Sequence, residues 1–109
     1  MFGNKTAKIN KAIEKGKVDV LIGLIHDKDE SVRVAAIDGR GKVKSADGVN
    51  PLVNLLHDTS AEVRKHAALA LGAIGEAHEK AHINFACETE TDPAAKAAMQ
   101  QAMNMLKNY

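Results

Sequence analysis

The sequence predicts an all-α protein: an α-solenoid of about three helical hairpins with a leading capping helix. The main observation is an internal repeat, in which residues 49–74 rewrite residues 18–43 with a displacement of 31 positions. The identical pairs are Val18/Val49, Leu21/Leu52, Leu24/Leu55, His26/His57, Asp27/Asp58, Val32/Val63, Arg33/Arg64, Ala36/Ala67 and Gly41/Gly72. The second observation is that aromatic residues make up only 3% of the chain, while alanine is abundant. A repeat of this period indicates stacked units, each covering the apolar face of its neighbour.

The capping helix is expected over residues 4–16. Ile9, Ala12 and Ile13 recur at helical spacing and would face the first hairpin, and Gly16 would end the helix. Such a cap is needed because an inner repeat leaves an apolar face uncovered at each end of a stack.

The first hairpin is expected over residues 18–44, with its second helix beginning near Glu30. Glycine costs about 1 kcal/mol relative to alanine inside a helix, and this helix contains Gly39 and Gly41. Arg40 also stands where the second copy has a leucine. We therefore expect the helix to fray or bend before Lys42, leaving a basic end at which an anion can bind.

The second hairpin is expected over residues 48–75. Pro51 suits a first helical turn, Asp58 or Ser60 can cap the next helix, and Gly75 suits its C-terminal stop. An apolar stripe at helical spacing identifies the second helix of this hairpin; its residues are Val63, Ala67, Ala70, Leu71 and Ile74.

The third hairpin is expected over residues 77–108. Its first helix covers residues 77–87, and Asp92 and Pro93 then supply a cap and a first-turn proline for a closing helix that reaches about Lys107.

Composition limits the class of protein. At 109 residues the chain suits one domain, residues 1–109. A net charge of +1 does not favour nucleic acid as the partner, and the longest apolar run, residues 20–25, is far too short for a membrane span. The single cysteine, Cys87, cannot form an intramolecular disulfide, so we expect a buried thiol in a cytoplasmic protein.

Residues 52–75, LVNLLHDTSAEVRKHAALALGAIG, resemble the HEAT-repeat family, most closely the short repeats of phycobilisome lyase-like proteins. The resemblance implies an α-solenoid whose second helices line a concave side that binds other proteins. It also implies that a turn aspartate and a following arginine join neighbouring units. The matching residues are Asp27, Asp58, Arg33 and Arg64.

The sequence therefore predicts a non-enzymatic protein–protein interaction module with no cofactor. The expected contact positions are those of the second helices that lie outside the apolar stripe: Val34, Ala35, Asp38, Lys65, His66, Leu69 and Ala73. Leu69 is the strongest candidate for an apolar anchor, because it stands between His66 and Ala73 on the outward face.

An alternative function is a metal-binding or lyase-type enzyme accessory. His78 and His82 form an H-E-x-x-H motif, whose two imidazoles would share one helix face. Lys80 puts a cation inside this motif, and a chain this small has no second lobe to form a substrate cleft. Both histidines are thus weak metal candidates, and no catalytic residue is expected.

Two further surfaces of the predicted stack could bind other partners. Lysines recur every three or four residues along the capping helix and offer an electrostatic site for nucleic acid, the less favoured partner; they are Lys5, Lys8, Lys11 and Lys15. In the closing helix, Met99, Met103 and Met105 either cover the third hairpin or offer an adaptable apolar surface. An end face of this kind could support a homodimer.

Overall fold

The computed structural model describes residues 2–106, with side chains from Lys5 to Leu106. Within this range the chain is all-α, as predicted, and the Cα atoms extend over 37 × 27 × 17 Å. The elements are α1 (Phe2–Lys15), α2 (Val18–Leu24), α3 (Glu30–Lys42), α4 (Asn50–Leu55), α5 (Ala61–Ile74), the short 3₁₀ helix η1 (Ala77–Glu79), α6 (Lys80–Thr89) and α7 (Pro93–Met105).

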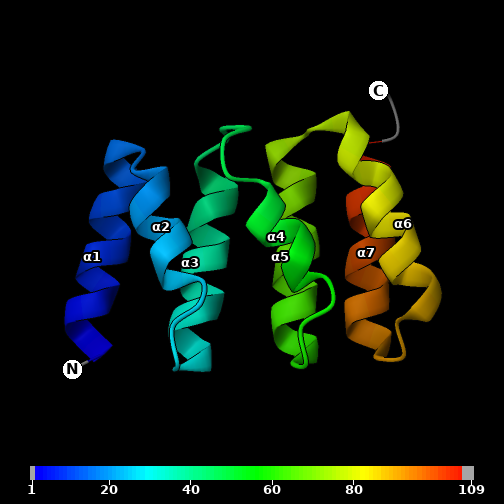
Figure 1. The fold of residues 1–109 in the computed structure, drawn as a ribbon, viewed down its shortest axis with the longest axis horizontal. Helices are drawn as coiled ribbons and strands as arrows, with labels where there is room; N and C mark the ends of the chain where they lie inside the picture. Colours follow the sequence, from blue (N-terminus) through cyan, green and yellow to red (C-terminus); the bar gives the residue numbers. More distant parts are fainter. Residues whose placement is uncertain (1, 107–109) are drawn as a thin grey trace.

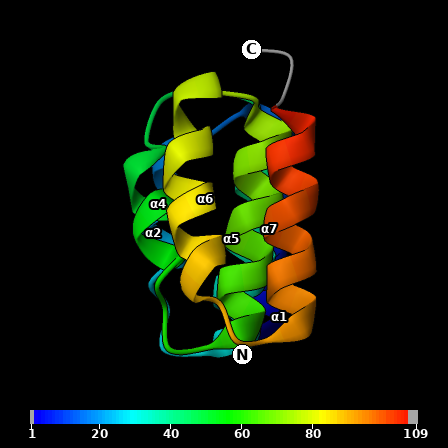
Figure 2. The same ribbon diagram turned by 90° about the vertical axis from the view of Figure 1, so that its right-hand side faces the viewer.

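The helices form two layers. α1, α3, α5 and α7 follow one another along the long axis in one layer, and α2, α4 and α6 lie against them in the other (Figures 1 and 2). We call these the second-helix layer and the first-helix layer. Each hairpin contributes one helix to each layer, which is the predicted α-solenoid. The largest aliphatic side chains of the core are Leu21, Ile25, Ile37, Leu52, Leu56, Leu71, Ile83 and Leu106.

Side-chain caps fix where the second helices begin. Asp29 caps α3, Ser60 caps α5 and Asp92 caps α7, each by accepting a hydrogen bond from a backbone N–H of the first turn. At the other end of α5, Gly75 has φ +86°, a left-handed conformation that glycine adopts without strain. The sequence left Asp58 and Ser60 open as the cap of α5, and Ser60 takes that role.

The expected break in α3 was wrong, because the helix continues without interruption to Lys42. Arg40 is 0% exposed. Its Nη1 donates to the carbonyl of Val43 at 2.6 Å, and its Nη2 donates to the carbonyls of Ser45, at 2.6 Å, and Asp47. The arginine thus fastens the α3–α4 linker to the core and is not available to an anion. Burial lowers the pKa of its guanidinium, an effect that nearby Asp47 opposes.

The glycines in this helix are contact positions rather than weak points. A Cβ atom on Gly39 would lie 2.9 Å from Ile13 Cδ1, and one on Gly41 would lie 3.1 Å from Ala70 Cα. The missing side chains therefore let α3 pack closely against both of its neighbours in the second-helix layer.

The third hairpin differs in detail from the prediction. The expected helix over residues 77–87 is split into η1 and α6, so that His78 lies in a 3₁₀ turn. α7 runs to Met105, and the predicted end of the closing helix at Lys107 falls outside the described residues. Over residues 2–106, each helix is too short or too polar to cross a lipid bilayer.

Candidate functional site

The seven predicted contact residues lie on α3 and α5, in the second-helix layer, and the structure brings three of them together. Asp38, Leu69 and Ala73 line a groove of ≈ 370 Å³ between these helices. We call it the α3–α5 groove, and its full lining is Asp38, Gly41, Lys42, Lys44, Leu69, Ala70 and Ala73. Ala35 lines a smaller neighbouring groove between α1 and α3, whereas Val34 and Lys65 line neither.

The floor of the α3–α5 groove is apolar and one end of it is basic. Leu69 and Ala73 are partly exposed along α5, and Gly41 and Ala70, both buried, complete the apolar lining. Lys42 and Lys44 are exposed at the rim and form no ion pair with any described side chain. The sequence predicted a basic helix end at Lys42 but not its place beside Leu69 and Ala73, and it gave no sign of Lys44.

At the other end of the groove, Asp38 belongs to a polar cluster whose other members, His66 and Glu62, lie outside the lining. His66 Nδ1 lies 2.6 Å from Asp38 Oδ1, and its Nε2 lies 3.3 Å from Glu62 Oε1. The imidazole therefore joins α3 to α5 and holds the Asp38 carboxylate in place. A ligand in the groove would meet the Asp38 carboxylate at this end and two ammonium groups at the other.

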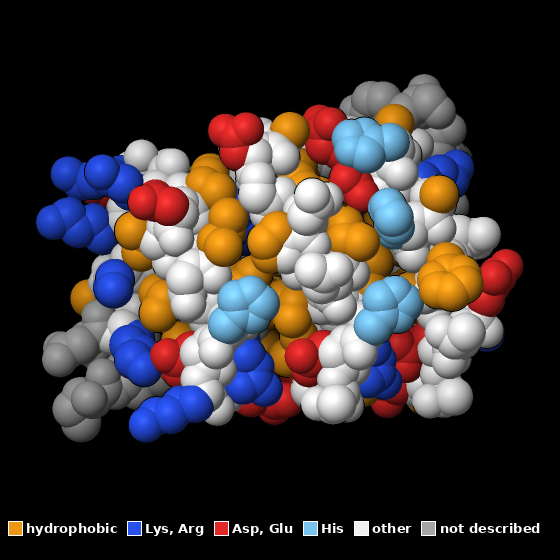
Figure 3. Space-filling view, in the orientation of Figure 1, with side chains coloured by type: hydrophobic (Ala, Val, Ile, Leu, Met, Phe, Trp, Pro, Cys, Tyr) orange, Lys and Arg blue, Asp and Glu red, His pale blue; other side chains and the backbone are white. Residues whose placement is uncertain are grey.

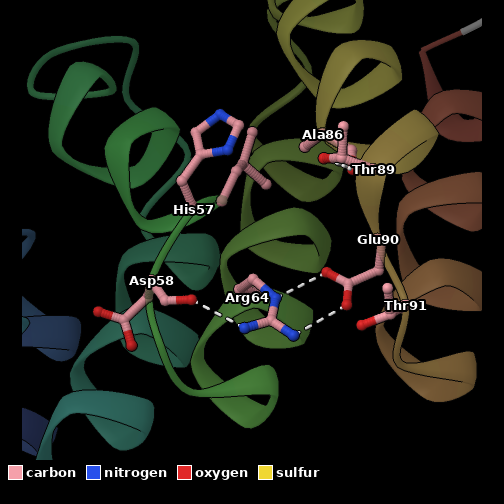
Figure 4. A pocket seen from close by; sticks show the side chains of 8 residues that line it. His57, Asp58, Arg64, Ala86, Thr89, Glu90 and Thr91 are labelled. Atoms are coloured by element: carbon pink, nitrogen blue, oxygen red, sulfur yellow. Dashed lines mark hydrogen bonds and ion pairs between the residues drawn. The ribbon is translucent and has the colours of Figure 1, made fainter.

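A second pocket, of ≈ 270 Å³, lies between the second and third hairpins around an Arg64–Glu90 ion pair (Figure 4). Arg64 Nε and Nη2 donate to the two carboxylate oxygens of Glu90 at 2.7 and 2.9 Å, and Nη1 donates to the Asp58 carbonyl at 2.8 Å. The Glu90 side chain is only 2% exposed. Its hydrogen bonds with Arg64 lower the pKa of Glu90 and raise that of Arg64. Through these hydrogen bonds, Arg64 links the second hairpin to the third.

The turn of the first hairpin is held by an equivalent arginine, and a different ion pair links this turn to α1. Arg33 Nη1 donates to the Asp27 carbonyl at 2.9 Å, as Arg64 does to Asp58. The Asp27 carboxylate accepts from Lys5 Nζ of α1 at 2.7 Å, and this hydrogen bond lowers the pKa of Asp27. Of the four predicted residues, Asp27 and Arg64 thus join neighbouring units, through Lys5 and Glu90. Among the described residues, Arg33 and the Asp58 carboxylate make polar contacts only within their own turns, and each arginine binds the main-chain carbonyl of its aspartate and not the carboxylate.

Glu90 is the turn acid of the third hairpin. Its Oε2 accepts from the backbone N–H of Asp92, two residues on, as the carboxylates of Asp27 and Asp58 do in their turns. The sequence signal for it was weak because this turn is displaced by one residue from the 31-residue register.

The H-E-x-x-H residues form an exposed cluster around a buried carboxylate. His78 Nε2 lies 2.8 Å from Glu79 Oε2, and His82 Nε2 lies 3.9 Å from Glu79 Oε1. Both imidazoles are mostly exposed, and the side chain of Glu79 is buried. Among the described residues there is no group of three or more His, Cys, Asp or Glu side chains able to hold a metal ion.

Between Lys5 and Leu106, two large apolar side chains are exposed. Phe85 of α6 is 61% exposed and meets the His57 ring edge-on, with ring centroids 6.0 Å apart. Sequence reasoning missed Phe85. Met105 is 46% exposed, whereas Met99 is buried and Met103 packs partly against the core. Most of the methionine set therefore covers the third hairpin, and the homodimer through an end face stays a prediction.

Lysines gather at the N-terminal end of the stack, over α1 and α2 (Figure 3). A groove of ≈ 210 Å³ there has Ala12 and Val20 in its lining; its other residues are Lys8, Lys11, Lys15 and Lys17. We call it the lysine groove. Lys5, predicted as part of the basic stripe, instead pairs with Asp27, and Lys17 takes part in its place.

The fold agrees with comparisons to known proteins. The family described as HEAT repeats matches residues 18–104. Two solved structures are similar over part of the chain: epoxyqueuosine reductase with a tRNA-Tyr epoxyqueuosine-modified tRNA stem loop (30% identity, TM-score 0.68, 70% of this chain and 20% of that one) and selenomethionine-labelled epoxyqueuosine reductase (29%, 0.66, 69% and 20%). The chain thus spans about a fifth of the length of those enzymes, and no curated protein matches it. From its repeated hairpins and the match over most of its length, the chain belongs to the HEAT-repeat family and is a helical repeat scaffold.

Proposed function

We propose that this scaffold is non-enzymatic and binds another protein in the α3–α5 groove. The observation that carries the proposal is the lining of that groove: a partly exposed apolar floor beside charged side chains that have no partner in the described chain. Rigid helices hold both features, so little conformational entropy would be lost on binding. The proposal includes a cytoplasmic setting, because the only cysteine, Cys87, is a buried free thiol.

Leu69 is the proposed anchor. It is partly exposed in a lining that also contains the small residues Ala70 and Ala73, so a partner side chain can reach it. A few central apolar contacts of this kind usually carry most of the affinity of an interface.

The test compares Leu69→Asp with Phe85→Asp, which makes the same apolar-to-acidic change on the other layer. Each variant is first checked by circular dichroism and is then used as bait in host extract, with quantitative mass spectrometry. Candidate partners are purified and titrated against the three proteins. We expect Phe85→Asp to keep the wild-type partner and Leu69→Asp to lose it. Loss with Phe85→Asp alone would place the interface on the first-helix layer and contradict the proposal, as would retention by both variants.

A second candidate function is RNA binding through the lysine groove. Two observations favour it: four lysines line one groove that has no acidic residue in its lining, and a similar structure is of an enzyme with a tRNA stem loop. Ammonium groups at this density attract a phosphate backbone, while the apolar floor is too small to stack bases.

Fluorescence anisotropy with a labelled RNA stem loop tests this candidate. If the four lysines each neutralise one phosphate, log K should fall with log salt with a slope of about −3. Lys8→Glu with Lys11→Glu should abolish RNA binding. Lys42→Glu with Lys44→Glu, which changes the net charge of the protein by the same amount, serves as the control. The absence of binding at low salt, or equal losses in the two double variants, would remove RNA as a candidate.

A further inference from the structure

The free charge of the α3–α5 groove is positive. Asp38 is the only acidic residue in its lining, and its carboxylate is already engaged by His66 at 2.6 Å. Lys42 and Lys44 are exposed and without an ionic partner among the described side chains. A segment entering the groove would therefore find two unsatisfied cations and no unsatisfied anion in its lining.

The position of Lys44 is determined by the core. Lys42 is the last residue of α3, where a cation also stabilises the helix C-terminus. Lys44 lies beyond the helix, and the helix dipole does not account for it. The buried Arg40 binds the carbonyls of Val43 and Ser45, the residues on either side of Lys44. This arrangement holds the backbone of Lys44 at the rim of the groove.

The groove also has a direction. Asp38, which is linked through His66 to Glu62 outside the lining, marks its acidic end, and the two lysines form its basic end, with Leu69 and Ala73 on the floor. A carboxylate of a bound segment would be repelled from the first end and attracted to the second. An aliphatic side chain of the same segment would lie on the floor.

We propose that the α3–α5 groove selects an acidic segment of a partner protein, one that places an aliphatic side chain next to one or more carboxylates. This inference rests on the proposed protein-binding function and adds the chemistry of the partner. The aliphatic side chain contacts Leu69, and the carboxylates pair with Lys42 and Lys44.

Selection from a phage-displayed library of random 12-residue peptides, with the intact chain as bait, tests this partner chemistry. We expect the selected peptides to be enriched in Asp or Glu adjacent to Leu or Ile. A synthetic peptide from this pool should bind about tenfold or more weakly to Lys42→Glu with Lys44→Glu, because like charges replace opposite ones. The matched control, Lys8→Glu with Lys11→Glu, changes the net charge equally at the lysine groove and should bind as the wild type does.

The double variant Lys42→Glu with Lys44→Glu provides a second readout. When it is used as bait, it should select basic peptides from the same library. Selection of neutral peptides, selection of none, or equal weakening by the two double variants would overturn the inference. If Leu69→Asp abolishes peptide binding and the lysine reversal does not, the groove binds protein and only the acidic preference fails. If neither change affects binding, the proposed function fails with it.

Discussion

Gly41 and Gly72 occupy equivalent positions in consecutive hairpins, and each lies against an alanine of the next helix in the second-helix layer. A Cβ atom on Gly41 would come within 3.1 Å of Ala70 Cα, and one on Gly72 within 3.0 Å of Ala102 Cα. The identity of this pair in the internal repeat is thereby explained. Both glycines set how closely one hairpin packs on the next.

We predict that Gly72→Ala destabilises the protein by about 1–3 kcal/mol, because the added methyl group overpacks the α5–α7 contact by more than the gain in helix propensity offsets. The matched control is Gly23→Ala in α2, where an added Cβ meets nothing within 4 Å. That change should be neutral or stabilise by up to about 0.5 kcal/mol. Urea denaturation measures both, and equal effects at the two sites would contradict the packing explanation.

Arg40→Met should destabilise the chain by about 3 kcal/mol or more, because the carbonyls of Val43, Ser45 and Asp47 lose a buried charged donor. Lys42→Met, two residues along on the exposed surface, should cost less than about 1 kcal/mol. Chemical denaturation gives the free energies of unfolding. Hydrogen exchange should show earlier opening of residues 43–48 in the arginine variant, and unchanged protection there would contradict the role of Arg40 in holding the linker.

The Arg64–Glu90 pair predicts a specific acid sensitivity. Arg64 lowers the pKa of Glu90 in the folded state, so the unfolded chain binds more protons at low pH. The contribution of Glu90 is fully present above the unfolded pKa, about 4.3, and is lost as pH falls through the lower folded value. Glu90→Gln should therefore be less stable by about 1–3 kcal/mol at pH 7 and lose less stability between pH 5 and 3 than the wild type.

Glu88→Gln is the control for this pair, since Glu88 is exposed on α6 two residues away. Its unfolding free energy should follow that of the wild type at each pH. An acid profile for Glu90→Gln that is parallel to the wild-type profile would show that the pair does not govern the acid response.

Asp92→Ala should cost about 1 kcal/mol, because the Asp92 carboxylate caps α7 by accepting from the Ala95 N–H at 2.9 Å. Asp92→Asn should restore much of the loss, since an amide oxygen can accept the same hydrogen bond. Thermal unfolding of the two variants checks this, and equal destabilisation by both would argue against the cap.

The helices and their caps were predictable because local sequence determines them. Ser60 and Asp92 are strong capping residues directly before apolar stripes, and Gly75 is a common helix stop. The fate of Arg40 was not predictable in this way. A charged residue at a leucine position indicates a weak helix end unless three carbonyls of a later linker converge on it, and that convergence depends on tertiary structure.

The candidate site was predicted in part. The positions of the second helices outside the apolar stripe were predicted as contacts. Three of them, Asp38, Leu69 and Ala73, line one groove. Lys44 was missed because its placement follows from the contacts of Arg40, and Lys42 was expected only as part of a frayed basic end. Phe85 was missed for a different reason: one aromatic residue in a helix gives no sign of whether it faces the core or solvent.

The repeated glycines also bear on how such a stack can change its length. The gap left at Gly41 receives the next hairpin, and Gly72 offers an equal gap to the one after it. If the coding sequence for one 31-residue repeat were duplicated, the extra hairpin would contain its own glycine. That glycine would leave room for the next hairpin to pack closely against it. A whole hairpin can thus be duplicated or removed without changing these contacts. Insertion or loss of part of a hairpin would place the glycine opposite a residue other than alanine.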